Sequence, residues 1–143
     1  FKQRAAQDYN KLGNCKNIFL KTSLTLLLIS AFPVIIIGVF APNIFEVIFG
    51  NKWIKSGVFT QLLMPMIFFK LIVSPVSYIF YIYKKLKEDF IIHIYMLASS
   101  WLILNFFYSK GDLESGILLF ALNYSAIYIY TWIRSYRFTL TKI

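Results

Sequence analysis

Four polar side chains recur along one face of an apolar segment in the middle of the chain. Lys70, Ser74, Ser77 and Tyr81 follow one another at helical intervals, so one helix would carry them in a single stripe. A lysine in the middle of a membrane helix costs about 2.5–3.5 kcal/mol on insertion scales, so it should face protein or water. Such a cation could attract a diphosphate group. Alternatively, it pairs with a carbonyl or an acid of another helix and stabilises the bundle.

A second polar face lies on the last apolar segment. Asn123 and Tyr124 are deep within it, and tyrosine rings can stack on sugars while amides and hydroxyls bind sugar hydroxyls. Aromatic residues also gather at membrane interfaces because they are amphipathic. We expect interface anchors at Trp53, Tyr128, Tyr130 and Trp132.

Few residues could support catalysis or metal binding. The only histidine, His93, could exchange a proton near neutral pH, but a single histidine in an apolar segment is more often a packing residue. Cys15 is the only cysteine, and no metal-site or nucleophile motif is present. We expect the six carboxylates in loops or linkers, at Asp8, Glu46, Glu88, Asp89, Asp112 and Glu114. The sequence therefore predicts no enzyme, no metal and no cofactor.

The elements that must position these residues are four apolar helices. The chain is 59% hydrophobic and 15% charged, whereas soluble domains carry about 25% charged residues. Three stretches of about 20 residues have no charge, and a fourth has only Lys70; this is the length that an α-helix needs to cross a bilayer. We predict an all-α integral membrane bundle with four transmembrane helices, at about 18–40, 58–83, 90–108 and 116–134.

The cations alternate between the two sides of this predicted bundle. Eleven lie before the first span, between spans two and three, or after span four, whereas the two other loops hold three. This is the positive-inside pattern, so both ends are expected in the cytoplasm and no nucleic-acid partner is expected. The eleven are Lys2, Arg4, Lys11, Lys16, Lys21, Lys84, Lys85, Lys87, Arg134, Arg137 and Lys142.

Two short helices should accompany the four spans. Residues 1–17 predict a cytoplasmic amphipathic helix that Gly13 ends, or else a solvated linker. Pro42 and Gly50 suit the start and the end of a short helix in the outer interface. Residues 18–143 would form a four-helix transmembrane lobe. Because the chain begins at Phe1 with a linker-like segment, we expect it to be a piece of a longer protein.

Two motifs in the middle of the chain accompany this order of features. A basic linker leads into an apolar span, and residues 49–57 then read F-G-N-K-W-I-K-S-G, which fits the pattern F-G-x-x-W-x-x-(A/S)-G. Residues 63–80 fit L-x-P-x-x-F-F-x-x-x-x-x-P-x-S-x-I-F. Together these features resemble the C-terminal part of bacterial polysaccharide flippases, which export O-antigen and capsule and belong to the multidrug/oligosaccharidyl-lipid/polysaccharide transporter superfamily. Spans three and four match only as generic apolar helices.

The resemblance implies a function and a location. The substrate would be an undecaprenyl-diphosphate-linked oligosaccharide, moved by alternating access across the bacterial cytoplasmic (inner) membrane. The expected partners are membrane lipids, this substrate, a missing N-terminal lobe of the same chain and other polysaccharide assembly proteins. Two alternatives remain open: a multidrug or lipid-II exporter of the same superfamily, and a non-transporting four-helix membrane assembly module.

Overall fold

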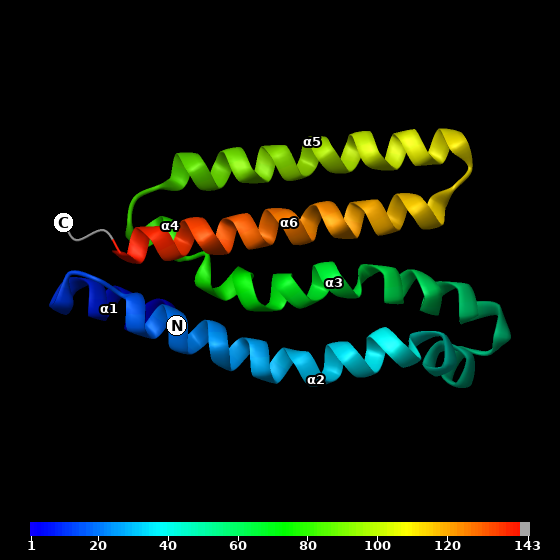
Figure 1. Ribbon diagram of the computed structural model, residues 1–143, viewed down its shortest axis with the longest axis horizontal. Helices are drawn as coiled ribbons and strands as arrows, with labels where there is room; N and C mark the ends of the chain where they lie inside the picture. Colours follow the sequence, from blue (N-terminus) through cyan, green and yellow to red (C-terminus); the bar gives the residue numbers. More distant parts are fainter. Residues whose placement is uncertain (141–143) are drawn as a thin grey trace.

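The computed structural model describes residues 1–140, and they fold almost entirely into helices (Figure 1). No β-strand occurs within these residues, so the predicted all-α class is confirmed. The elements in chain order are α1 (Lys2–Leu12), α2 (Lys16–Phe49), the 3₁₀ helix η1 (Asn51–Trp53), α3 (Ile54–Val76), α4 (Ile79–Ile82), α5 (Leu86–Lys110) and α6 (Leu113–Leu140).

Four helical segments are long and apolar enough to cross a membrane, as the sequence predicted. They are α2, the stretch Asn51–Ile82, α5 and α6, each longer than the corresponding predicted span. The helices lie side by side in the order α2, α3, α6, α5 (Figure 1). Their outer faces expose large hydrocarbon side chains: Leu28, Phe32 and Leu97 are 65%, 72% and 73% exposed. Apolar surface on this scale is typical of a protein surrounded by lipid or by partner helices.

The bundle has two chemically different ends. At one end lie α1, α4 and the C-terminal part of α6, and we call it the α1 end; η1 and the turn at Gly111 form the opposite end, the η1 end (Figure 1). The lysines and arginines expected on one side gather at the α1 end, apart from Lys142, which lies outside the described residues. The η1 end carries equal numbers of acids and bases, namely Glu46, Asp112 and Glu114 with Lys52, Lys55 and Lys110.

The separate outer helix predicted between Pro42 and Gly50 is wrong, because α2 continues through Pro42 to Phe49. A proline within a helix leaves the carbonyl four residues earlier without its usual donor. Here that carbonyl belongs to Gly38, and Gln61 Nε2 on α3 donates to it over 2.8 Å. The same nitrogen donates to the next carbonyl over 3.0 Å. The side chain of Gln61 therefore supplies the donor that Pro42 lacks.

A glycine lets α3 approach α2 closely at this point. A Cβ atom on Gly57 would lie 2.5 Å from the Cα of Pro42, a distance that real Cβ atoms do not tolerate. Because position 57 has no side chain, the two backbones can touch and Gln61, one turn later, can reach the carbonyls of α2.

The second predicted span, 58–83, is not one continuous helix. After Pro75, α3 ends at Val76, and α4 starts at Ile79. The chain tightens between them, because the amides of Phe80 and Tyr81 bond to carbonyls only three residues earlier. This break changes the direction of everything beyond it, including Tyr81.

The main buried cluster lies at the α1 end, where the short helices meet the long ones. Its buried members are Ala5, Cys15, Phe19, Val76, Ile79, Phe80 and Phe138. Helix α1 ends at Gly13, in the left-handed conformation, as the sequence suggested. The apolar face of α1 is only partly covered by the rest of the protein: Ala5 is buried, Phe1 and Tyr9 are half-buried, and Leu12 is exposed. Helix α1 thus packs against the bundle.

Candidate functional site

A groove between α3, α5 and α6 brings together polar side chains from all three helices. Its volume is about 430 Å³, with α6 as its floor and α3 and α5 as its walls. We call it the polar groove. Its polar lining residues are Lys70, Ser74 and Ser77 of α3, Asp89 and His93 of α5, and Tyr124, Tyr128 and Thr131 of α6.

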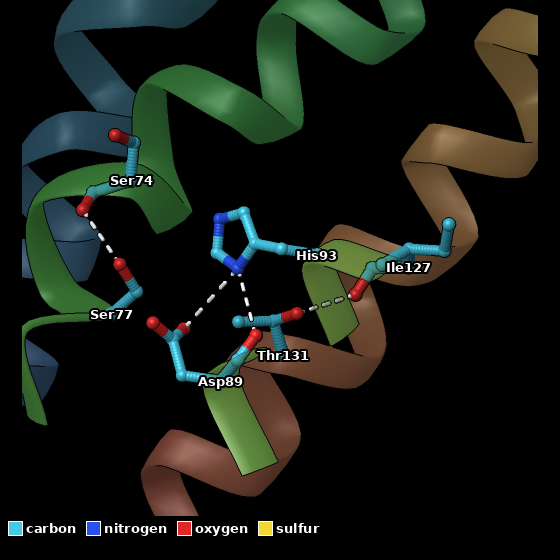
Figure 2. Close-up of polar contacts among 6 residues, drawn as sticks. All are labelled: Ser74, Ser77, Asp89, His93, Ile127 and Thr131. Atoms are coloured by element: carbon cyan, nitrogen blue, oxygen red, sulfur yellow. Dashed lines mark hydrogen bonds and ion pairs between the residues drawn. The ribbon is translucent and has the colours of Figure 1, made fainter. Parts of the chain in front are cut away.

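Lys70 reaches this groove without a partner. Its side chain is exposed, and among residues 1–140 no carboxylate or carbonyl forms an ion pair or hydrogen bond with its Nζ atom. Ser74 is exposed one turn further along α3, and its carbonyl accepts a hydrogen bond from Ser77 Oγ over 2.9 Å (Figure 2). The ammonium group is therefore available to an anion that enters the groove.

The groove also contains an acid and a histidine that sequence reasoning did not place there. In Figure 2, His93 projects from α5 into the space between α3 and α6. Its Nδ1 atom lies 2.8 Å from the Asp89 carbonyl oxygen and 3.8 Å from Asp89 Oδ1. The His93 side chain is 67% exposed and that of Asp89 only 18%. The expectation that Asp89 lies in a loop is wrong, because α5 begins at Leu86.

A sequence signal for this pair did exist. Asp89 and His93 are four residues apart, so a helix that begins before Asp89 must place them on one face. We expected that helix to start at Phe90, which left the acid outside it.

The predicted stripe on α3 enters the groove only in part. Lys70, Ser74 and Ser77 line it together, but Tyr81 lies beyond the break and lines an adjoining cavity of about 390 Å³. Asp89 and His93 line both cavities, so the polar surface continues towards the α1 end.

The two candidate residues of the last helix point in different directions. Tyr124 lines the polar groove, and its hydroxyl oxygen is 2.8 Å from Ser100 Oγ of α5. Asn123 instead donates from Nδ2 to Ser99 Oγ over 2.9 Å and lines a separate cavity beside Glu88. The prediction of one shared cavity therefore does not hold for Asn123, because neighbouring residues on a helix lie about 100° apart.

The four aromatic residues predicted as interface anchors occupy different environments. Tyr128 lines the polar groove, and Tyr130 lines the cavity that contains Asn123. Trp132 joins α6 to α2 because its Nε1–H donates to Ser23 Oγ over 3.1 Å. Trp53 is exposed at the η1 end.

An apolar groove lies on the other side of α3. It has a volume of about 480 Å³ and separates α2 from parts of α3 and α6. Its lining residues are Leu20, Ser23, Leu24, Leu27, Phe69, Ile72, Val73, Ile129 and Trp132. The buried side chain of Val73 contributes to both grooves. Helix α3 therefore presents polar residues to one groove and hydrocarbon to the other.

The polar groove has the chemistry of a binding site for a polar or anionic group. It offers one unpaired ammonium group, one imidazole and several hydroxyls, together with the carboxylate of Asp89. Among residues 1–140, no group of three or more His, Cys, Asp or Glu side chains could hold a metal ion. Comparisons with protein-family models, curated proteins and solved structures found no match. Functional inference therefore rests on this groove and on the motifs between residues 49 and 80.

Proposed function

We propose that this chain forms part of a flippase that moves an undecaprenyl-diphosphate-linked oligosaccharide across the bacterial cytoplasmic membrane. One observation carries the proposal: the unpartnered ammonium of Lys70 opens into a hydroxyl-lined groove in a bundle whose outer faces are hydrocarbon. The resemblance of residues 49–80 to polysaccharide flippases supports it independently.

A groove of this kind addresses the main physical obstacle to moving such a lipid. A diphosphate cannot cross hydrocarbon without losing its hydration, and an unpaired charge in a medium of low dielectric constant is very costly. Lys70 would offset that cost by pairing with the diphosphate, while the exposed Ser74 offers a hydroxyl to the head group. The polyprenyl tail would remain in the lipid beside the bundle.

The distribution of charge supports an orientation for the proposed flippase. The cation-rich α1 end would face the cytoplasm, and the η1 end the outer side. A second lobe of the same protein would close the groove on its open side, and rocking of the two lobes would alternate access. Other polysaccharide assembly proteins would then receive the lipid-linked product.

Asp89 gives specific support to one alternative. A carboxylate within the groove could attract an organic cation, as a multidrug exporter of the same superfamily requires. Lys70 opposes this, since it would repel a cation that enters deeply. The third candidate, a non-transporting assembly module, requires that a neighbouring helix seal the groove around Lys70.

The proposal is tested with the full-length gene product in a host that depends on it for surface polysaccharide. Lys70→Ala should lower surface polysaccharide about tenfold or more, because a charge-assisted contact contributes about 1.5–3 kcal/mol. Lipid-linked precursor should accumulate in the inner leaflet, and Lys70→Arg should retain most of the activity. The control is Lys52→Ala, which removes an exposed lysine at the η1 end and should behave as wild type.

Three results would contradict the proposal. Unchanged polysaccharide in Lys70→Ala would remove the lysine from the transport path. A fall in polysaccharide that matches a fall in protein abundance would make Lys70 a stabilising residue. Loss of organic-cation export in Asp89→Asn, with normal polysaccharide in Lys70→Ala, would favour the multidrug exporter.

A further inference from the structure

Three lysines are concentrated where α4 gives way to α5, two in the turn between these helices and one in the first turn of α5. Lys84, Lys85 and Lys87 are all exposed, and they lie at the α1 end of the bundle. Within residues 1–140 the carboxylates beside them are engaged elsewhere: Glu88 pairs with Arg134 of α6, and Asp89 lies against His93. None of the three lysines forms an ion pair with an acid of the described chain. Their charge is directed outward and is not neutralised locally.

The backbone at Lys84 has a left-handed conformation, which residues other than glycine rarely adopt. Its φ angle is 54°, and it is the only residue other than glycine with a positive φ among residues 1–140. The next amide, of Lys85, donates to the carbonyl of Phe80 over 2.7 Å, which is the bond that closes a helix at this kind of turn. Glycine is the residue that this conformation favours, since a Cβ atom makes it costly. Lysine occupies a position that glycine would fill with less strain.

Apolar side chains lie directly beside this cationic turn. Leu86 and Phe90 of α5 are 49% and 65% exposed, and the exposed ring of Tyr81 stacks on Tyr78 at a centroid distance of 5.2 Å. Cations next to exposed aromatic and aliphatic side chains match the boundary between head groups and acyl chains. If a soluble acidic protein bound the three lysines instead of a membrane, this hydrocarbon would remain exposed to water.

We propose that Lys84, Lys85 and Lys87 form a binding site for the head groups of anionic phospholipids in the leaflet at the α1 end. The inference rests on the membrane insertion that is part of the proposed function, but not on its substrate. Lysine clusters next to a membrane helix attract acidic lipids through charge. The contrast with the η1 end sharpens the assignment, because acids balance the three lysines there.

The site is tested on full-length protein purified with mixed phosphatidylglycerol and phosphatidylcholine, by native mass spectrometry of the retained lipids. The test variant is the triple substitution Lys84→Gln, Lys85→Gln, Lys87→Gln, and the matched control is Lys52→Gln, Lys55→Gln, Lys110→Gln. Each lysine near an anionic surface contributes about a factor of five in affinity, so the test variant should retain phosphatidylglycerol at least about tenfold less. The control should keep the wild-type preference.

A single substitution separates lipid binding from a structural role. Lys84→Gly removes the charge and relieves the backbone, so phosphatidylglycerol retention should fall about fivefold while the thermal midpoint stays constant or rises. A lower midpoint together with unchanged lipid retention would make Lys84 structural and would overturn the proposal.

The remaining outcomes are equally decisive. Equal lipid loss in both triple variants would show an effect of net charge alone, and wild-type retention in both would exclude the site. Complete displacement of the lipid by inorganic phosphate would identify a site for soluble anions. Protein that leaves the membrane in an alkaline wash would refute both this inference and the proposed flippase, whereas membrane-bound protein with unaltered lipid preference would refute this inference alone.

Discussion

The polar groove and the apolar groove lie on opposite sides of α3 and differ in chemistry far more than in size. Their volumes are about 430 and 480 Å³, and Val73 contributes to both. Lys70 and Ser74 face one groove, whereas Phe69 and Ile72, their near neighbours in the chain, face the other. A helix thus separates two environments by its period alone, because adjacent residues point about 100° apart.

The two grooves also differ in how their walls are joined. Beside the polar groove, α5 and α6 are linked by a hydrogen bond between the hydroxyls of Tyr124 and Ser100 and by one from Asn123 to Ser99. Across the apolar groove, α6 is joined to α2 by the bond from Trp132 Nε1–H to Ser23 Oγ. Polar contacts between helices are retained in an apolar medium because water cannot replace them.

A lysine introduced on the apolar side of α3, compared with one on its polar side, should give the largest effect on stability. Ile72→Lys places an ammonium group at a buried position that faces hydrocarbon, so we expect a loss of about 3 kcal/mol or more in stability. Ser74→Lys places the same group in the polar groove and should cost less than about 1 kcal/mol, mainly from repulsion by Lys70. Thermal unfolding in detergent and the yield of monodisperse protein measure both. Equal losses would abolish the distinction between the two sides.

Removing the hydrogen bonds from Gln61 of α3 to α2 should have an intermediate effect on stability. Gln61→Leu leaves the Gly38 carbonyl without the donor that replaces the one lost at Pro42, and we expect a loss of about 1–3 kcal/mol. The control is Asn105→Leu, because Asn105 is exposed and donates only within its own helix, to the Trp101 carbonyl. Thermal midpoints of the two variants give the comparison. If Gln61→Leu has the same thermal midpoint as the control, the helix at Pro42 does not depend on hydrogen bonds from α3.

Removing single hydrogen bonds between α6 and its neighbours should have the smallest effect on stability. Tyr124→Phe removes a hydroxyl on the polar side and should cost about 0.6 kcal/mol. Trp132→Phe removes the bond to Ser23 and also leaves a space in the apolar groove, so it should cost more. Chemical unfolding of the two single variants measures the difference. A larger loss in Tyr124→Phe would show that the walls of the polar groove are the more tightly coupled.

The sequence predicts the long helices well because a bilayer-length helix cannot tolerate many charges. The three charge-free stretches and the one that contains only Lys70 therefore identified four helices long and apolar enough to cross a membrane. The predictions failed where a side chain from another helix decides the outcome. Gln61 donates to the Gly38 carbonyl, which Pro42 leaves without its usual donor, and no local pattern in α2 contains that information.

The candidate site could be predicted only along single helices. The helical period correctly grouped Lys70, Ser74 and Ser77, but the break after Pro75 removed Tyr81 from their line. Which helix faces them is a tertiary property, so helical spacing alone does not predict that His93 joins them. Asp89 was missed for a simpler reason, since charged residues at a helix start look like loop residues when only hydropathy is considered.

Thiol labelling from the aqueous phase tests most directly whether the polar groove admits water while the apolar groove does not. Ser74→Cys and Phe69→Cys are compared in the full-length membrane protein, with Cys15→Ala removing the native thiol. That thiol is already protected, since burial raises the pKa of Cys15 and keeps the reactive thiolate scarce. We expect a membrane-impermeant maleimide to label position 74 and to leave position 69 unlabelled. Absence of labelling at position 74 under all conditions, or equal labelling at both positions, would contradict a water-filled groove on one side of α3.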